Sequence, residues 1–284
     1  MRCNIIQHGS DGIGHQLYGL FTTLILHNIQ NYNFCANIFI NKRFRFDHVS
    51  QKEGEDLKNY MIETINNFIK ENNIKENNIK ENNTKETIIK NCIHTHELNK
   101  IPKTYNINTV YSIDNAYYFE RINLNNEEKK NHKNNIEKFK NYFINNKFLP
   151  KNRLEEKSIV IHIRLGDAMN YNNWANEIND NNNKIKEVLC ILKKKYPTYK
   201  LYIHSNGNPD IFNDFEYTFF DKNTPVLQFL SDVINSDIFI CAPSALSKIS
   251  TFFSKAKTII IPDDTKQSVS ENCIKISNYI NLNK

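Results

Sequence analysis

Glycine and arginine are scarce in this 284-residue chain. It has seven glycines and six arginines, and no arginine follows Arg164. No apolar run approaches the roughly 18 residues of a membrane-spanning helix, and the N-terminus enters a strand-like segment without the pattern of a signal peptide. The formal net charge of +6 comes mainly from dispersed lysines, which argues against a nucleic-acid partner. We therefore expect a cytoplasmic protein with no integral membrane segment.

Cysteine pairs are also missing. The six cysteines are far apart and form no Cys-x-x-Cys motif, which excludes a disulfide framework and favours a reducing compartment. The segment 94–97, His-Thr-His-Glu, could suit a metal, because alternate residues of one strand face the same way. Only two ligands would face the same way and no third is evident, so we expect a solvated segment and no metal site.

Alternating apolar runs predict an α/β fold. From Ser158 onward we expect strands at 159–164, 200–204, 237–241 and 257–261, with helices at 182–195, 225–235 and 244–255. Before it we expect strands at 2–7, 34–40, 87–93 and 108–113, with helices at 14–30 and 127–146. A low-complexity insert lies around 70–84 and a linker at 150–157. Two domains, 1–150 and 151–284, follow from this pattern.

The predicted strand that begins near Ser158 ends in charged and polar residues of the kind found in active sites. The apolar run from Ser158 stops at His162, Arg164, Gly166 and Asp167. A β-branched run that ends in charge is typical of a buried parallel strand whose carboxyl end opens into a ligand-binding crevice. A core strand followed by an ordinary polar turn is the alternative.

Six of the seven glycines lie at three strand ends, where positive φ or close approach of a ligand requires them. They are Gly9, Gly12, Gly14, Gly19, Gly166 and Gly207. Tight turns without a ligand would place them likewise. The first loop lacks the Gly-x-Gly-x-x-Gly order of a dinucleotide site, and the chain has no Gly-Lys-Ser/Thr phosphate loop. The helix that begins near Gly14 still offers N–H groups to an anion or a sugar hydroxyl.

These segments together resemble the fucosyltransferase superfamily that shares a His-x-Arg-x-x-Asp motif, and they look most like its α1,2 group. The Gly-Gly-x-Gly-Asn-Gln-Leu opening of that group is similar to residues 11–17, and its Asn-Ser-Ser-Phe-Ser-Trp-Trp segment is similar to 243–249. Its Phe-Ser-Asp-Asp strand end is loosely similar to 201–206. His15 stands in place of the usual Asn, Leu165 in place of a second Arg, and Lys248-Ile249 in place of the tryptophans.

The resemblance implies a GT-B fold, in which two Rossmann-like domains face each other across a cleft. The N-terminal domain would lie on the acceptor side and the C-terminal domain would bind GDP-fucose. It also implies an inverting transfer of fucose to a hydroxyl of a glycan or glycoprotein, without a metal or other cofactor. The chain has no Asp-x-Asp motif to hold a divalent ion against a diphosphate, so a guanidinium would neutralise the leaving GDP.

Residue roles follow from the same resemblance. Arg164 would bind the β-phosphate and the glycosidic oxygen, where charge develops in the transition state. His162 would bind ribose or phosphate, or orient Arg164, unless it is an ordinary crevice-wall histidine. Asp167 would hold Arg164 or the guanine, because a carboxylate beside a required Arg has a lowered pKa and is a poor base.

Further donor contacts are expected from three segments of the chain. The expected residues are Gly12, Gly14, His15, His204, Ser205, Ser244 and Ala245. For Ser244 a simple helix-capping role is the alternative. The general base is not identified, and Asp11, His15 and Glu177 are candidates. Trp174 would stack on an acceptor sugar or cover the core. The alternatives to this function are an enzyme for another nucleotide sugar and an inactive, carbohydrate-binding relative.

Overall fold

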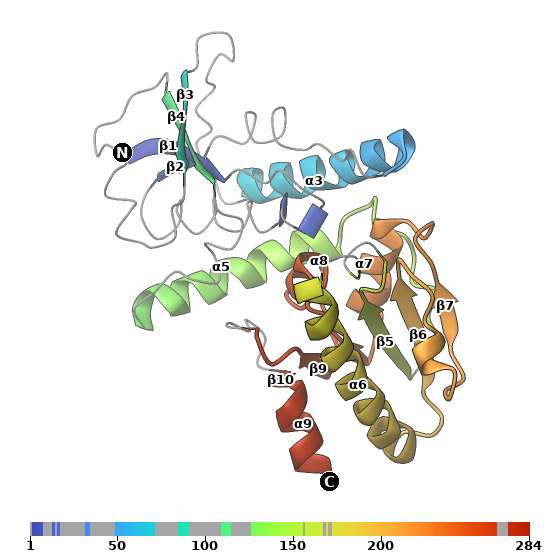
Figure 1. Ribbon diagram of the computed structural model, residues 1–284. Coiled ribbons are helices and arrows are strands. Elements are labelled where there is room, and N and C mark those ends of the chain that lie inside the picture. Colours follow the sequence, from blue (N-terminus) through green and yellow to red (C-terminus); the bar gives the residue numbers. More distant parts are fainter. Residues whose placement is uncertain are drawn as a thin grey trace. The chain divides into compact units, whose positions relative to one another are not determined.

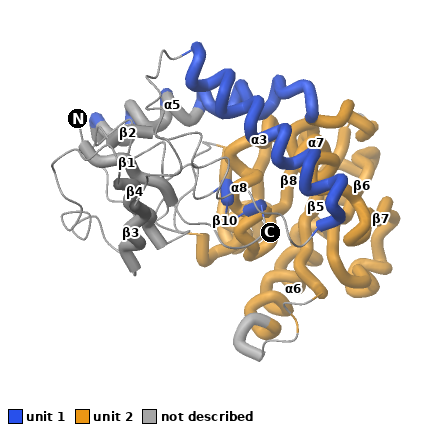
Figure 2. Tube along the Cα trace, turned by 90° about the horizontal axis from the view of Figure 1, so that it is seen from above, with its two compact units in different colours: residues 1–148 blue, residues 149–284 orange. Residues whose placement is uncertain are grey.

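The computed structural model describes residues 2–7, 13–14, 16–17, 32–34, 49–71, 85–90, 109–114, 126–155, 157–166, 169, 172–265 and 272–284. The chain divides into two compact units, residues 1–148 and 149–284, which Figure 2 colours separately. Each unit contains its own parallel β-sheet, so the predicted α/β class is confirmed. The predicted helix at 14–30 lies largely outside the described residues, as do residues 35–40, 72–84 and 91–93.

Unit 1 contains a four-stranded parallel sheet with the order β2-β1-β4-β3. Its strands are β1 (Arg2–Gln7), β2 (Tyr32–Phe34), β3 (Lys85–Lys90) and β4 (Thr109–Asp114). Its two long helices are α3 (Gln51–Glu71) and α5 (Asn126–Ile144). The predicted bounds of β1, β4 and α5 agree with these within two residues. The predicted strand at 87–93 overlaps β3, the one at 34–40 shares only Phe34 with β2, and α3 was not predicted.

Helices α3 and α5 pack through aromatic side chains. The rings of Tyr60 and Phe143 are 5.5 Å apart, and those of Phe68 and Phe139 are 5.2 Å apart, both edge to face. The Tyr60 hydroxyl donates a hydrogen bond of 2.9 Å to the carbonyl oxygen of Phe143. Edge-to-face rings and a paired hydroxyl are the arrangement that buried aromatic residues favour, so this pair forms the core of the helical layer.

Unit 2 contains a six-stranded parallel sheet with the order β10-β9-β8-β5-β6-β7 (Figure 1). The strands are β5 (Ser158–Ile163), β6 (Lys200–Ser205), β7 (Thr218–Phe220), β8 (Ile238–Ile240), β9 (Thr258–Ile261) and β10 (Cys273–Lys275). Counted along the unit, the first strand lies in the middle, with the second and third on one side and the fourth to sixth on the other. This 3-2-1-4-5-6 order is that of the Rossmann fold.

Helices cover both faces of this sheet. They are α6 (Asn172–Lys195), α7 (Val226–Asn235), α8 (Ala245–Ser250) and α9 (Ile276–Asn283). Ile161 and Ile163 of β5 share an apolar cluster with α6 and α9, to which Val188 and Tyr279 belong. On the opposite face, the ring of His162 lies 4.9 Å from that of Phe229 on α7. Successive residues of β5 thus alternate between the two helical layers.

Several boundaries differ from the predictions. Helix α6 begins at Asn172, ten residues before the predicted start. The prediction missed its first turns because they are rich in asparagine and show no apolar stripe. Helix α8 ends at Ser250, since Phe252 and Phe253 donate to carbonyl oxygens three residues back and so leave the α-helical pattern. The short edge strands β7 and β10 and the terminal helix α9 were not predicted.

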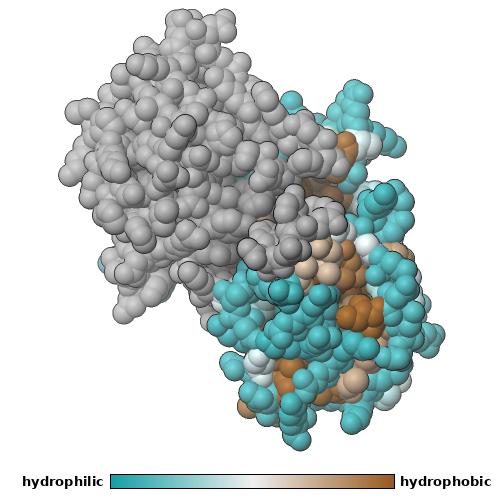
Figure 3. All heavy atoms as spheres, viewed as in Figure 1, coloured by the Kyte–Doolittle hydropathy of each residue, from teal (hydrophilic) through white to brown (hydrophobic). Residues whose placement is uncertain are grey.

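The visible surface of unit 2 is mainly hydrophilic, with small apolar areas between polar ones (Figure 3). Phe219 and Leu282 are the large apolar side chains that are exposed among the described residues. No helix in the described part of the chain combines the length and apolar character needed to cross a bilayer.

Candidate functional site

The carboxyl end of β5 lies where the strand order of the unit 2 sheet reverses. β5 pairs with β6 on one side and with β8 on the other. The strands that follow β5 in the chain are first added on the β6 side of the sheet and then, from β8 onward, on the opposite side. In open α/β sheets, ligands bind in the crevice at this reversal, outside the carboxyl ends of the strands. Arg164 is the first residue after β5, so it lies at this position.

The backbone after Arg164 is held by the loop that follows β6. The side-chain oxygen of Asn206 accepts hydrogen bonds from the backbone N–H groups of Leu165 (3.3 Å) and Gly166 (2.9 Å). A Cβ at Gly166 would lie 2.6 Å from Asn206 Nδ2, and one at Gly207 would lie 2.8 Å from Leu165 Cβ. No described glycine has positive φ. These two glycines are therefore explained by the close contact of two loops.

His162 projects to the α7 face of the sheet, two positions before Arg164. Its ring packs against Phe229, and its Nδ1 is buried with no hydrogen-bond partner in the described part of the chain. Burial, the neighbouring His204 and the positive charge of Arg164 lower its pKa from 6.5 to about 3. His162 is thus a neutral imidazole at physiological pH, and Arg164 supplies the positive charge at this strand end.

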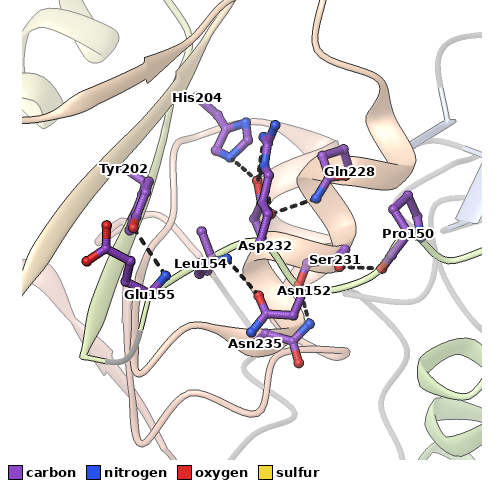
Figure 4. Close-up of polar contacts among 11 residues, drawn as sticks. Pro150, Asn152, Leu154, Glu155, Tyr202, His204, Gln228, Ser231, Asp232 and Asn235 are labelled. Carbon is purple, nitrogen blue, oxygen red and sulfur yellow. Dashed lines mark hydrogen bonds and ion pairs between the residues drawn. The ribbon is translucent and has the colours of Figure 1, made fainter.

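His204, on β6, is the register partner of His162 on β5, and it belongs to a buried polar network (Figure 4). Its Nε2 is 3.0 Å from Asp232 Oδ2 on α7, and Asp232 also accepts hydrogen bonds from Arg153 (2.8 Å) and Gln228 (2.9 Å). Burial alone raises the pKa of Asp232, but these donors outweigh burial and the pKa lies below its usual value. For His204, burial lowers the pKa more than Asp232 raises it. A carboxylate, a guanidinium and a neutral imidazole therefore meet here.

Further contacts beside this network join the first residues of unit 2 to α7, β6 and β7. The Ser231 hydroxyl donates to the carbonyl oxygen of Pro150 at 2.8 Å, and the Glu155 N–H donates to the Tyr202 hydroxyl at 3.2 Å. Arg153 Cζ also lies 3.6 Å from the centre of the Phe220 ring. The predicted linker at 150–157 is thus bound to unit 2 over most of its length.

The loop after β8 lies on the other side of the strand-order reversal. Ser244 caps α8: its hydroxyl accepts a hydrogen bond of 3.2 Å from the Ser247 N–H, and its φ and ψ are extended. The Ser247 hydroxyl in turn accepts from the Ala242 N–H at 2.8 Å. Ser244 is buried and Ala245 is the first residue of α8. The capping role, which the sequence offered as the alternative for Ser244, is therefore present.

The remaining predicted site residues are placed as follows. Ser205 is buried at the end of β6, and its hydroxyl accepts from the Gly207 N–H at 3.1 Å. Gly14 is buried in a helical segment of unit 1. Gly12, His15 and Asp167 lie outside the described residues, as do Asp11 and the segment 94–97. Glu177 is exposed on α6. His162 and His204 thus lie side by side on β5 and β6, and Arg164 follows His162 by two positions. Ser205 ends β6 on the opposite face, and Ser244 and Ala245 follow β8.

Sequence reasoning missed Arg153, Asn206 and Asp232 as parts of this site. A charged residue inside the apolar helix 226–235 is the signal that marks Asp232, because an isolated buried charge is unfavourable without partners. Arg153 and Asn206 carry no comparable signal, since their partners are 79 and 40 residues away in the chain. No group of three or more metal-ligating side chains occurs within the described ranges.

No family model matches this chain, and no curated protein matches it. Among solved structures, it is similar to Staphylococcus aureus MnaA in a co-structure with UDP, at 8% identity. The alignment covers 99% of this chain and 87% of that one, with a TM-score of 0.40. A similarity of this size assigns neither an activity nor a ligand to the chain.

Proposed function

We propose that this protein is an inverting, metal-independent glycosyltransferase that transfers fucose from GDP-fucose to a glycan hydroxyl, in the manner of α1,2-fucosyltransferases. The observation that carries the proposal is the position of Arg164, directly after the central strand of a sheet with Rossmann strand order, where the order reverses. A nucleoside diphosphate is the kind of ligand that this position accepts in such sheets.

The proposed chemistry uses Arg164 on the leaving group. The acceptor oxygen forms a bond to the anomeric carbon, and the bond from that carbon to the β-phosphate oxygen breaks with its electron pair on GDP. A planar guanidinium binds two phosphate oxygens at once and stabilises this charge more in the transition state than in the ground state. The acceptor hydroxyl gives its proton to a base, for which Asp11, His15 and Glu177 remain the candidates. Asp167 is assigned to holding Arg164 or guanine.

The two-domain GT-B arrangement is part of this proposal. Unit 2 would bind the donor, and unit 1, whose four-stranded sheet is also parallel, would form the acceptor side and add donor contacts from Gly12, Gly14 and His15. His162, as a neutral imidazole, would donate or accept one hydrogen bond at the ribose or phosphate. Ser244 and Ala245 would approach the diphosphate from β8, and His204 and Ser205 would line the β6 side.

The proposal is tested by binding and turnover with substituted Arg164. Arg164→Ala removes a contact worth about 3–4 kcal/mol of barrier, so GDP-fucose turnover should fall roughly 10²- to 10³-fold. Arg164→Lys should also be badly impaired, because an ammonium lacks the planar fork. Lys200→Ala is the matched control: it removes an exposed positive charge at the amino end of β6, the opposite edge of the sheet. Wild-type turnover in Arg164→Ala would refute the mechanism.

The nucleotide and the activity are tested separately. GDP should raise the melting temperature more than UDP, because a ligand that binds only the native state stabilises it according to its affinity. A larger shift with UDP would instead indicate an enzyme for another nucleotide sugar. Binding of GDP-fucose without release of GDP, even with a panel of glycan acceptors, would indicate an inactive carbohydrate-binding relative.

A further inference from the structure

Asp232 is a fully buried carboxylate on α7, next to buried apolar side chains of that helix. Its side chain has no exposed surface, whereas that of Arg153 is 36% exposed. Arg153, from the segment before β5, and Gln228, on α7 itself, donate hydrogen bonds to it. His204 Nε2, on β6, lies 3.0 Å from its Oδ2. Such a buried ion pair adds little net stability compared with apolar side chains of similar volume. It joins the segment before β5, β6 and α7 at one point.

The Asp232 network lies next to His162, on the same face of the sheet. His162 and His204 are register partners on the adjacent strands β5 and β6, so their side chains project from the same face. Both rings contact the same ring of α7, since Phe229 lies 4.9 Å from His162 and 5.1 Å from His204. Asp232 follows Phe229 by three residues, about one helical turn, so its contacts set the position of that ring.

His162 depends on this packing for its orientation. Among the described residues, its Nδ1 has no hydrogen-bond partner that would select one ring orientation. Its position is therefore determined by the strand and by the ring of Phe229. A small displacement of α7 relative to β5 would turn this imidazole away from the strand end that carries Arg164.

We propose that Asp232 is a positioning residue of the nucleotide site: by holding α7 against β5 and β6 through Arg153 and His204, it fixes the His162 ring beside Arg164. The identity of the ligand rests on the proposed function, but the effect on the His162 ring does not. Asp232 touches no ligand itself. Arg153 acts with it, since its guanidinium both binds Asp232 and stacks on Phe220.

Asp232→Asn is the sharpest substitution. It keeps the size of the side chain but removes its charge. The Oδ1 position faces Gln228 and the Oδ2 position faces Arg153 and His204, so the new amide either points its N–H group at Arg153 and His204 or requires the Gln228 amide to turn. In both orientations the ion pair with Arg153 is lost. Arg153→Lys is the milder variant: it keeps the positive charge but removes the fork and the stacking on Phe220.

The first measurement is the ¹⁵N imidazole NMR spectrum of the full-length protein without ligand, with His162 assigned by comparison with His162→Gln. The second is the affinity for GDP by calorimetry. Leu189→Ala is the matched control, because Leu189 is a buried residue of α6 on the opposite face of the sheet. It should lower the melting temperature by loss of packing but leave the His162 signals and the GDP affinity unchanged.

For Asp232→Asn, we expect shifted His162 signals and GDP affinity that is lower by roughly 2- to 30-fold, the range found for residues that act through neighbours. Arg153→Lys should shift the same signals less, and it decides the question if Asp232→Asn does not fold. Unchanged His162 signals in a folded network variant would overturn the inference. So would equal losses of GDP affinity in the network variants and in Leu189→Ala. Wild-type protein that binds no GDP would refute the proposed function alone, because the NMR signals still report on the network.

Discussion

The Asn206 side chain holds Gly166 in place: its Oδ1 accepts the Gly166 N–H at 2.9 Å, which joins the loops that follow β5 and β6. The same oxygen accepts from Leu165, at 3.3 Å. Because Arg164 immediately precedes these two residues, the backbone beyond the candidate phosphate ligand is fixed from the neighbouring strand. The contact leaves no room for a side chain at Gly166.

Gly166→Ala should therefore destabilise the protein. The new Cβ would lie 2.6 Å from Asn206 Nδ2 and 3.0 Å from the Asn206 carbonyl oxygen, so the amide must move and lose its hydrogen bonds. We expect a decrease of about 1–3 kcal/mol in the free energy of unfolding, as is common for overpacked sites. Urea denaturation measures it.

Gly54→Ala is the control for this prediction. Gly54 lies inside α3, where alanine is favoured over glycine by about 0.5–1 kcal/mol, so this substitution should stabilise the protein or leave it unchanged. If Gly166→Ala and Gly54→Ala had the same effect, close packing of the two loops would not be the reason for glycine at 166.

Much of unit 2 could be predicted from its apolar runs. The segments that became β5, β8 and β9 are rich in isoleucine, and β6 contains the apolar run Leu-Tyr-Ile, so both their type and their approximate bounds could be found. The three-residue strands β7 and β10 could not, because they lie at the sheet edges and are too short to show a period. Helix α3 did carry a readable stripe. It comprises Leu57, Tyr60, Met61, Thr64, Ile65, Phe68 and Ile69.

The candidate site divides in the same way. Arg164 and His162 could be found because they end a continuous apolar strand, and Ser244 because it precedes a helix. The partners that set their geometry could not, since Asp232 meets Arg153 and His204 only through the crossing of β6 and α7 in space. Local sequence patterns report which strand ends in polar residues, whereas the supporting contacts depend on the strand order.

Removal of the Ser244 hydroxyl should weaken α8. Ser244→Ala leaves the Ser247 N–H without its acceptor, and loss of such a cap costs about 1 kcal/mol of stability. Ser244→Thr retains the hydroxyl and should recover most of the loss. Both are measured by thermal unfolding. If Ser244→Ala matched the wild type in stability, the capping hydrogen bond would contribute nothing.

The cysteines of unit 2 should differ in their reaction with an alkylating reagent. Burial raises the pKa of Cys241 to about 12, and its thiol donates to the Ala242 carbonyl oxygen at 3.3 Å. Since the thiolate is the reactive form, Cys241 should stay unmodified in the native protein while the exposed Cys190 reacts. Peptide mass spectrometry after brief iodoacetamide treatment distinguishes the two. Equal labelling of both would show that the loop after β8 opens readily.

Stability should fall as the pH is lowered through the range in which histidine normally gains a proton. His162 has a pKa of about 3 in the folded protein and 6.5 in the unfolded chain, so the unfolded state binds more protons between these values. The stabilising effect of a neutral His162 is complete above pH 6.5 and is lost as the pH falls toward 3. His204, whose pKa is also lowered, acts in the same direction. Each histidine contributes at most about 1.4 kcal/mol per pH unit to this slope.

The slope is measured by urea unfolding at intervals from pH 7.5 to pH 4.5. His162→Gln removes one titrating group from the α7 face, so it should flatten the dependence between pH 6.5 and 4.5 without abolishing it, because His204 remains. A variant as steep as the wild type would mean that His162 is protonated in the folded protein near its ordinary pKa. The imidazole would then carry a charge beside Arg164, and the interpretation of His162 as a neutral imidazole would be wrong.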